Sequence, residues 1–261
     1  MRIDELLWRK RFPRLHSMQP PLAGSSYGSP PALRWLLVVF FSLVPFALQA
    51  GEHGPSLFHS FRLETDIGNS HGNALTRWDL DGWIGKDRDK LWLKSEGDVT
   101  HEGTQKSEFR AMYSRNVAEF WDAQIGLRQD IQPETTSYLT LGVDGLAPYY
   151  FETEAHLFVS DKGDTTVRIK ERNDLLITQR LIAQPYLEIN LSAQDVPELG
   201  IGSGITSGEV GLQTRYEFAR EFAPYIDLRY ESKFGTTAKW AGNSGENRDG
   251  FIAGAGVMLK F

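Results

Sequence analysis

An alternation of apolar and polar residues dominates this sequence and recurs in twelve segments after residue 57. It is clearest between Tyr149 and Val159, where every second residue from Phe151 to Val159 is Phe, Thr, Ala, Leu or Val. The intervening row holds Glu152, Glu154 and His156. Because side chains on a β-strand alternate between the two faces of its sheet, this pattern predicts strands with one apolar face and one charged face.

The twelve segments are separated by turn residues, and no helical periodicity of useful length is found after Gly51. The predicted strands are Phe58–Ile67, Ala74–Ile84, Lys90–Thr100, Glu108–Val117, Trp121–Ile131, Ser137–Leu146, Tyr149–Val159, Thr166–Arg180, Ile182–Ala193, Gly208–Phe218, Pro224–Lys233 and Phe251–Phe261.

Two closed barrels are compatible with this pattern, a soluble barrel with an apolar interior and a membrane barrel with an apolar exterior. Twelve strands enclose an interior that one layer of Leu, Ala and Val side chains cannot fill, which favours the membrane barrel. Aromatic residues also fall near the segment ends, as interfacial girdles do: Phe120, Trp121, Tyr149, Phe151, Phe218, Phe222 and Phe261. We therefore predict an all-β fold, a 12-stranded antiparallel outer-membrane β-barrel over residues 58–261, with its charged rows facing the lumen.

The lengths of the connections between segments also alternate along the chain, which favours the same membrane barrel. Connections after even-numbered segments are short, whereas those after odd-numbered segments include Gln194–Ser207, Gly235–Asp249 and His101–Ser107. Outer-membrane barrels have short periplasmic turns and longer outer loops. The pattern therefore predicts that both ends of the barrel chain lie in the periplasm.

The apolar run Trp35–Ala47 follows Arg34 and ends near the small residue Ala50. A basic flank, a short apolar run and a small residue are the parts of a secretory signal, and the run is short for a membrane span. We predict that residues 1–50 are a leader and signal peptide and that residues 51–57 form a short periplasmic segment. A start site placed too far upstream would explain the long stretch 1–33, and Met18 is the alternative start. The other interpretation of the run is a buried strand or helix of the domain.

Exclusion of the leader leaves an acidic chain without cysteine. Residues 1–50 hold six of the 28 basic and two of the 34 acidic side chains, so 22 basic and 32 acidic groups remain, a net charge of −10. An acidic exported domain is a poor nucleic-acid binder and attracts cations. The lack of cysteine excludes disulfides and thiolate metal sites.

Several side chains on the predicted inner rows are potential metal ligands. Imidazole nitrogen suits copper, zinc and nickel, and thioether sulfur suits cuprous copper. The candidate ligands are His156, Glu154, Glu152, Met112 and Met258. The same residues can instead be wall residues whose charges pair with those of Arg168, Lys170 and Arg172 on the next segment. No hydrolase motif is found, so we predict no enzymatic activity.

Five stretches of this chain resemble the copper resistance protein B family of outer-membrane proteins. They are Trp78–Asp98, Tyr113–Asp130, Leu141–Phe158, Leu175–Leu191 and Gly211–Ala238, within a likeness that covers about Ala74 to Phe261. The resemblance implies an outer-membrane protein that binds copper ions and mediates their passage or sequestration, working beside periplasmic copper proteins. Copper would be bound or transported and would have no catalytic role.

The chain departs from the family between signal and barrel. Family members commonly carry a segment rich in Met and His there, whereas Gly51–Ser60 has only His53 and His59 and no methionine. This departure shifts any metal role toward the lumen and loops. The alternative function is a general small-solute channel or structural outer-membrane protein with incidental metal binding.

Overall fold

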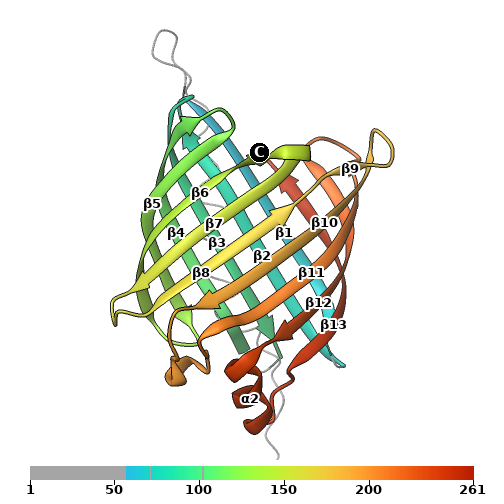
Figure 1. Cartoon of the computed structure of the whole chain (residues 1–261). Coiled ribbons are helices and arrows are strands. Elements are labelled where there is room, and N and C mark those ends of the chain that lie inside the picture. The colour runs from blue at the N-terminus through green and yellow to red at the C-terminus, as the bar shows by residue number, and fades with distance from the viewer. Residues whose placement is uncertain (1–56, 71, 102) are drawn as a thin grey trace, which may run out of the picture. The chain divides into compact units, whose positions relative to one another are not determined.

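The computed structural model describes residues 57–70, 72–101 and 103–261, which form one antiparallel β-sheet closed into a barrel (Figure 1). Sequence neighbours pair around the sheet, and β13 (Asp249–Lys260) pairs with β1 (Phe58–Ser70) to close it. Closure satisfies the hydrogen-bonding groups that a sheet edge would leave unpaired, as a lipid environment requires. The predicted closed antiparallel barrel is confirmed.

Between β1 and β13 the chain follows the order expected from the alternation. The strands are β2 (Asn73–Gly85), β3 (Asp89–Thr100), β4 (Gly103–Ala118), β5 (Trp121–Gln132), β6 (Thr136–Ala147), β7 (Phe151–Ser160), β8 (Thr165–Arg172), β9 (Leu175–Leu176), β10 (Leu181–Ser192), β11 (Gly204–Tyr216) and β12 (Phe222–Lys233). The 3₁₀ turns η2 (Pro148–Tyr150) and η3 (Pro197–Leu199) and the helix α2 (Gly235–Asn243) lie in connections. None of the helices in the described residues is long and apolar enough to cross a membrane.

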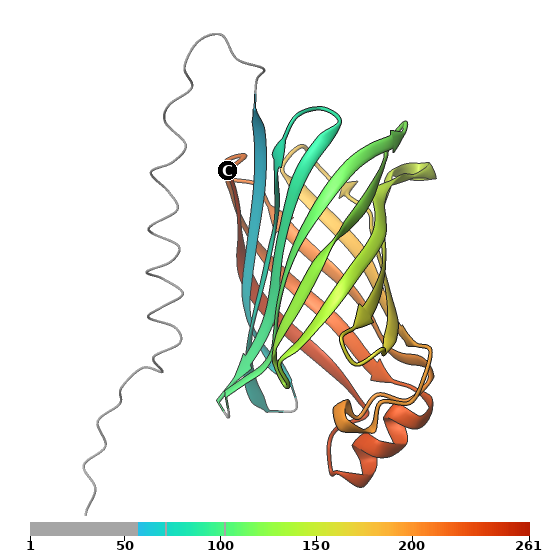
Figure 2. The same ribbon diagram turned by 90° about the vertical axis from the view of Figure 1, so that its left-hand side faces the viewer.

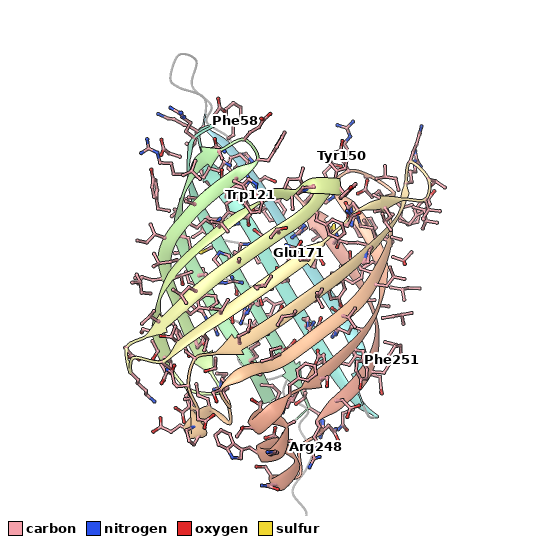
Figure 3. The ribbon with its side chains drawn as sticks, viewed as in Figure 1. Phe58, Trp121, Tyr150, Glu171, Arg248 and Phe251 are labelled. Atoms are coloured by element: carbon pink, nitrogen blue, oxygen red, sulfur yellow. The ribbon has the colours of Figure 1, made fainter. Side chains whose placement is uncertain are left out.

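The apolar and charged rows occupy the predicted faces of the sheet. On the outer face, the side chains of Leu127 and Ile226 are 66% and 60% exposed, and Phe251 points away from the barrel in Figure 3. On the inner face, Met112 and Arg110 are 0% and 1% exposed. Apolar side chains therefore face lipid, and the lumen is lined by polar and charged groups.

The predicted eighth strand, Thr166–Arg180, is wrong as a single element. It is interrupted between β8 and β9, and Thr178 lies in the turn before β10. The break lies opposite Pro185 of β10, which has no N–H to donate to a neighbouring strand. Because β8 and β9 follow each other along the same side of β10, together they occupy one of twelve strand positions.

Two further boundaries, the starts of β7 and β4, differ from the predictions. The seventh strand begins at Phe151, because Tyr149 and Tyr150 have positive φ angles of 66° and 63° in the turn η2. The predicted loop His101–Ser107 is mostly strand, since β4 begins at Gly103. The register of β4 shifts against both β3 and β5 near its start. These irregularities interrupt the alternation of apolar and polar residues, so the sequence pattern did not predict this part of the strand.

The helix α2 was also not predicted, because its nine residues, GTTAKWAGN, contain no apolar stripe. It lies in the connection between β12 and β13, one of the two long connections that the sequence predicted. Figure 2 shows α2 at one end of the barrel and the C-terminus at the other. The start of β1 lies at the same end as the C-terminus, since Phe61 and Phe261 exchange backbone hydrogen bonds of 2.8 and 3.0 Å.

By the loop-length rule for outer-membrane barrels, the end with the two chain termini is the periplasmic end. The predicted leader and signal, residues 1–50, lie outside the described residues, as does the following segment except Leu57.

Candidate functional site

One side of the lumen is filled by a buried network of ion pairs. Arg168 of β8 binds both carboxylate oxygens of Glu108 on β4, with N–O distances of 2.9 and 3.0 Å. Glu108 also forms ion pairs with Arg110 and Arg128, at N–O distances of 3.2 and 3.0 Å. Glu96 is bound by Arg110 and by Lys170, the latter at 2.7 Å. The network joins β3, β4, β5 and β8, so this part of the barrel is packed with paired charges.

His156 is buried in the wall of the lumen on β7. Its ring lies over Gly142 of β6, where an added Cβ would be 2.3 Å from the His156 Cδ2 atom. Because Gly142 has no side chain, His156 extends over β6 to β5, where its Nε2 atom lies 2.8 Å from the Gln124 Oε1 atom. Because an amide oxygen only accepts hydrogen bonds, Nε2 donates in this arrangement and Nδ1 is the nitrogen left for a metal ion.

The two predicted carboxylate ligands differ in their surroundings. Glu154 is bound by two cations, Lys94 and Arg172, each at 2.7 Å. The Glu152 side chain is 50% exposed near the periplasmic end and lies 3.9 Å from Arg172. Glu154 is therefore held in a second, separate group of ion pairs, while Glu152 faces the lumen opening.

The two predicted thioether ligands lie on separate strands. Met112 is on β4, and Met258 is on β13, where it packs with Ala223 and Tyr225. Strands β1, β2 and β3 lie between them. Within residues 57–70, 72–101 and 103–261, no group of three or more His, Asp or Glu side chains is arranged to hold a metal ion. The five-residue site stays a prediction.

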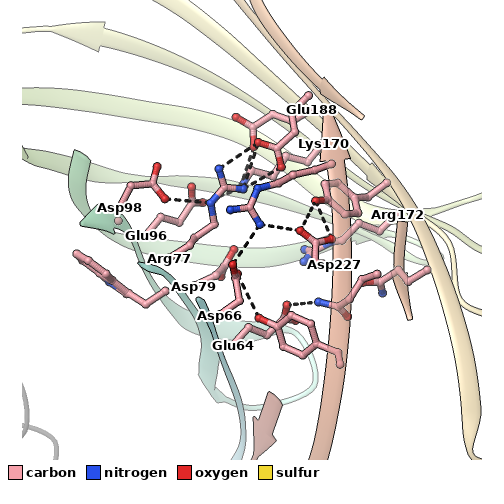
Figure 4. Close-up of a pocket in the computed structure, with 18 of the residues that line it drawn as sticks. Glu64, Asp66, Arg77, Asp79, Glu96, Asp98, Lys170, Arg172, Glu188 and Asp227 are labelled. Atoms are coloured by element: carbon pink, nitrogen blue, oxygen red, sulfur yellow. Dashed lines mark hydrogen bonds and ion pairs between the residues drawn. The ribbon is translucent and has the colours of Figure 1, made fainter. Parts of the chain in front are cut away.

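Three cavities follow one another along the lumen, and we name them by position. The inner vestibule, about 540 Å³, is at the periplasmic end and is lined by residues such as Ser60, Trp83 and Asp144. The central cavity, about 130 Å³, lies next to it (Figure 4). The outer vestibule, about 310 Å³, is lined by residues such as Ser207 and Arg248.

An arginine lines both cavities at each of the two places where consecutive cavities meet, and Lys106 and Glu188 also line both cavities at the outer one. Arg172 lines both the inner vestibule and the central cavity, and Arg77 lines both the central cavity and the outer vestibule. Arg77 binds Asp98 at 3.0 Å, Glu209 at 2.9 Å and Glu231 at 2.7 Å. We call Arg77 and these three carboxylates the outer clamp.

Carboxylates outnumber cationic side chains in all three cavities. The counts are five to three in the inner vestibule, eight to five in the central cavity and five to four in the outer vestibule. Each cavity is therefore more attractive to a cation than to an anion.

Part of this excess comes from a row of carboxylates on adjacent strands. Glu64 of β1 pairs in register with Asp79 of β2, Asp79 with Glu96 of β3, and Glu96 with Glu108 of β4. Among the described residues, Asp79 has no ion pair within 4.0 Å, and its side chain accepts no hydrogen bond. The sequence placed these residues on inner rows, but their meeting depends on strand register, which the alternation does not give.

A family model described as copper resistance protein B precursor (CopB) matches residues 58–261. The chain belongs to this family. Copper resistance protein B of Escherichia coli is 40% identical over 185 residues, which cover 70% of this chain and 62% of that protein. Its homolog from Pseudomonas syringae pv. tomato (strain ATCC BAA-871 / DC3000) is 38% identical over 193 residues, 74% of this chain and 65% of that protein. The chain thus spans less than two thirds of the length of these relatives.

Solved structures support the barrel architecture of this copper resistance protein B family member. The NanC porin has a TM-score of 0.55 at 13% identity, covering 76% of this chain and 100% of that one. The KdgM porin has a TM-score of 0.51 at 10% identity, covering 77% and 99%. At these identities the likeness concerns the fold alone. Family and fold together place the chain in the outer membrane.

The resemblance to the family seen in the sequence is confirmed. His59, from the short segment before the barrel, is an exposed residue of β1, and His53 lies outside the described residues.

Proposed function

We propose that this chain acts in copper resistance by binding copper ions weakly in the lumen of its barrel and passing them across the outer membrane, without catalysis. The observation that carries this proposal is the line of three cavities, each with an excess of carboxylates. A cation entering either vestibule meets a favourable potential along the whole line. An anion meets an unfavourable one.

Copper would be favoured over other divalent cations by its chemistry. For a given set of nitrogen and oxygen ligands, affinity rises toward Cu²⁺ in the first-row series. Asp79, which lines the central cavity and has no ion-pair partner in the described chain, offers a carboxylate. His156 is buried in the wall and lines none of the three cavities, and its Nδ1 would offer a nitrogen ligand from there. Because no three-ligand cluster is preformed in the described residues, binding would be weak, as transit requires.

The inner vestibule would exchange copper with periplasmic copper-resistance proteins. It opens at the periplasmic end and holds the half-exposed carboxylate of Glu152. High-capacity storage is not part of this proposal, since Gly51–Ser60 contains two histidines and no methionine.

The experiment is a flux assay with the purified barrel in liposomes, comparing Cu²⁺, Ca²⁺ and Na⁺ entry. Faster entry of Cu²⁺ than of Ca²⁺ supports copper passage. Equal rates for all three ions would instead support the alternative function, a general small-solute channel. Copper titration of wild-type and His156→Ala barrels completes the test, and identical binding would remove His156 from the site.

A further inference from the structure

We infer that the outer clamp is a gate. Arg77 closes the passage between the outer vestibule and the central cavity when its side chain extends from β2 across the lumen to Glu209 and Glu231. This inference rests on the proposed function, because it names the residue that controls entry into the line of cavities.

The geometry of the outer clamp places its contacts on two separate parts of the wall. Asp98 is the direct cross-strand neighbour of Arg77, on β3 beside β2. Glu209 and Glu231 are on β11 and β12, and β13 and β1 lie between β12 and β2. The Arg77 side chain therefore spans a chord of the barrel in the observed state.

The chord is where the two cavities meet. Arg77, Asp98 and Glu209 all line both the central cavity and the outer vestibule. The Arg77–Glu209 contact is bidentate, with N–O distances of 2.9 and 3.2 Å from the two terminal nitrogens, and so it fixes the guanidinium group across the passage.

In the released position the Arg77 guanidinium itself would stay paired, whereas Glu209 would lose its ion-pair partner among the described residues. If Arg77 releases Glu209 and Glu231, it keeps Asp98, whose Oδ1 atom already accepts its Nε–H at 3.0 Å. Glu209 and Glu231 would then be free to meet a cation. The two positions differ in side-chain rotamer rather than in backbone, so exchange between them needs no change in the barrel.

Site-directed labelling tests the gate, because the chain contains no cysteine and an introduced thiol is unique. Asp79→Cys places a thiol in the central cavity, and it breaks no ion pair in the described chain. The reagent is 2-aminoethyl methanethiosulfonate, added outside intact cells that carry the full chain in their outer membrane. The measured quantity is the rate of disulfide formation.

We expect Arg77→Gln to raise the labelling rate of the Asp79→Cys thiol by about tenfold, the factor expected when charge-assisted hydrogen bonds hold the closed state. Glu209→Gln should raise it less, because Glu231 still holds Arg77. Asp98→Asn removes the contact that supports the released position, so its rate should not exceed that of the parent. Unchanged rates in both Arg77→Gln and Glu209→Gln would overturn the gate.

Three controls test whether a faster labelling rate of the Asp79→Cys thiol is due to the outer clamp. Arg128→Gln removes another ion-paired arginine of the lumen that lines none of the three cavities, and it should leave the rate unchanged. A thiol at Ser207→Cys in the outer vestibule should label equally in all backgrounds. A thiol at Ser60→Cys in the inner vestibule detects reagent that arrives through the periplasm. An increase at Ser60→Cys equal to that at Asp79→Cys would contradict an outer gate.

The labelling assay contains no copper, so the gate and copper passage can fail separately. If Arg77→Gln speeds labelling but the barrel shows no preference for Cu²⁺ in liposomes, the gate stands and the proposed function falls. If Cu²⁺ enters selectively and labelling is as fast in the parent as in Arg77→Gln, the proposed function stands and the gate falls.

Discussion

Arg168 binds both oxygens of the Glu108 carboxylate, at 2.9 and 3.0 Å, and thereby joins β8 to β4 through the lumen. The Glu108 side chain is 1% exposed and also forms ion pairs with Arg110 and Arg128. Charge pairing through the lumen, together with backbone pairing around the wall, therefore defines the native barrel.

Glu108→Gln should destabilise the barrel by about 3–5 kcal/mol, because it leaves buried guanidinium groups without their counter-charge. The measurement is urea unfolding in lipid vesicles, followed by tryptophan fluorescence. Glu198→Gln, which breaks only an exposed ion pair with Lys162, serves as the control and should unfold at the parent urea concentration. Equal stability of the Glu108→Gln barrel would contradict a structural role for the network.

Gly142→Ala should destabilise the barrel by about 1–3 kcal/mol, since the added Cβ overlaps the His156 ring. The same substitution in a His156→Ala background should cost less, because the ring is gone and only the 2.6 Å approach to the Ala155 carbonyl oxygen remains. A double-mutant cycle of unfolding free energies measures the difference. If the unfolding free-energy changes of Gly142→Ala and His156→Ala are additive, the position of the His156 ring does not depend on the absence of a side chain at Gly142.

Leu127→Arg should destabilise the barrel by about 2–4 kcal/mol, because this outward side chain lies near the middle of β5, where a membrane barrel meets the hydrocarbon. Val117→Arg is the matched control, since Val117 is similarly exposed at the periplasmic end of β4 and should cost about 0–1 kcal/mol. Unfolding in vesicles compares the two. Similar costs would argue against a lipid-facing position for Leu127.

Asp79→Asn should weaken copper binding and slow copper flux on the order of tenfold, about 1.4 kcal/mol. Asp79 lies in register between Glu64 and Glu96 in the central cavity, so its neutralisation lowers the local negative potential. Stability should not fall, because the Asp79 side chain has no ion pair among the described residues. Copper titration measures binding, liposome assays measure flux, and urea unfolding measures stability. Parent-like flux would remove Asp79 from the path.

The sequence by itself determined which residues lie on which face of the sheet, and through that the barrel. Leu127 and Phe251 face outward and Arg110 and Met112 inward as predicted, because side-chain direction in a strand follows from a period of two alone. The two longest loops and the ends of the barrel chain were also predicted. Where the period is interrupted, by Pro185 opposite the β8–β9 break or by irregular pairing at β4, the predicted strand boundaries were wrong.

Only the tertiary structure decided which charges meet. Arg77 finds Glu209 across a chord of the barrel, His156 reaches Gln124 over Gly142, and Met112 and Met258 lie on separate strands, although all were correctly placed on inner rows. Register and barrel curvature set these distances, and both arise from pairing between segments far apart in the chain. The alternation of apolar and polar residues is local and does not specify which segments pair or in which register. The charged lining of the lumen was therefore predictable, but its arrangement into three cavities was not.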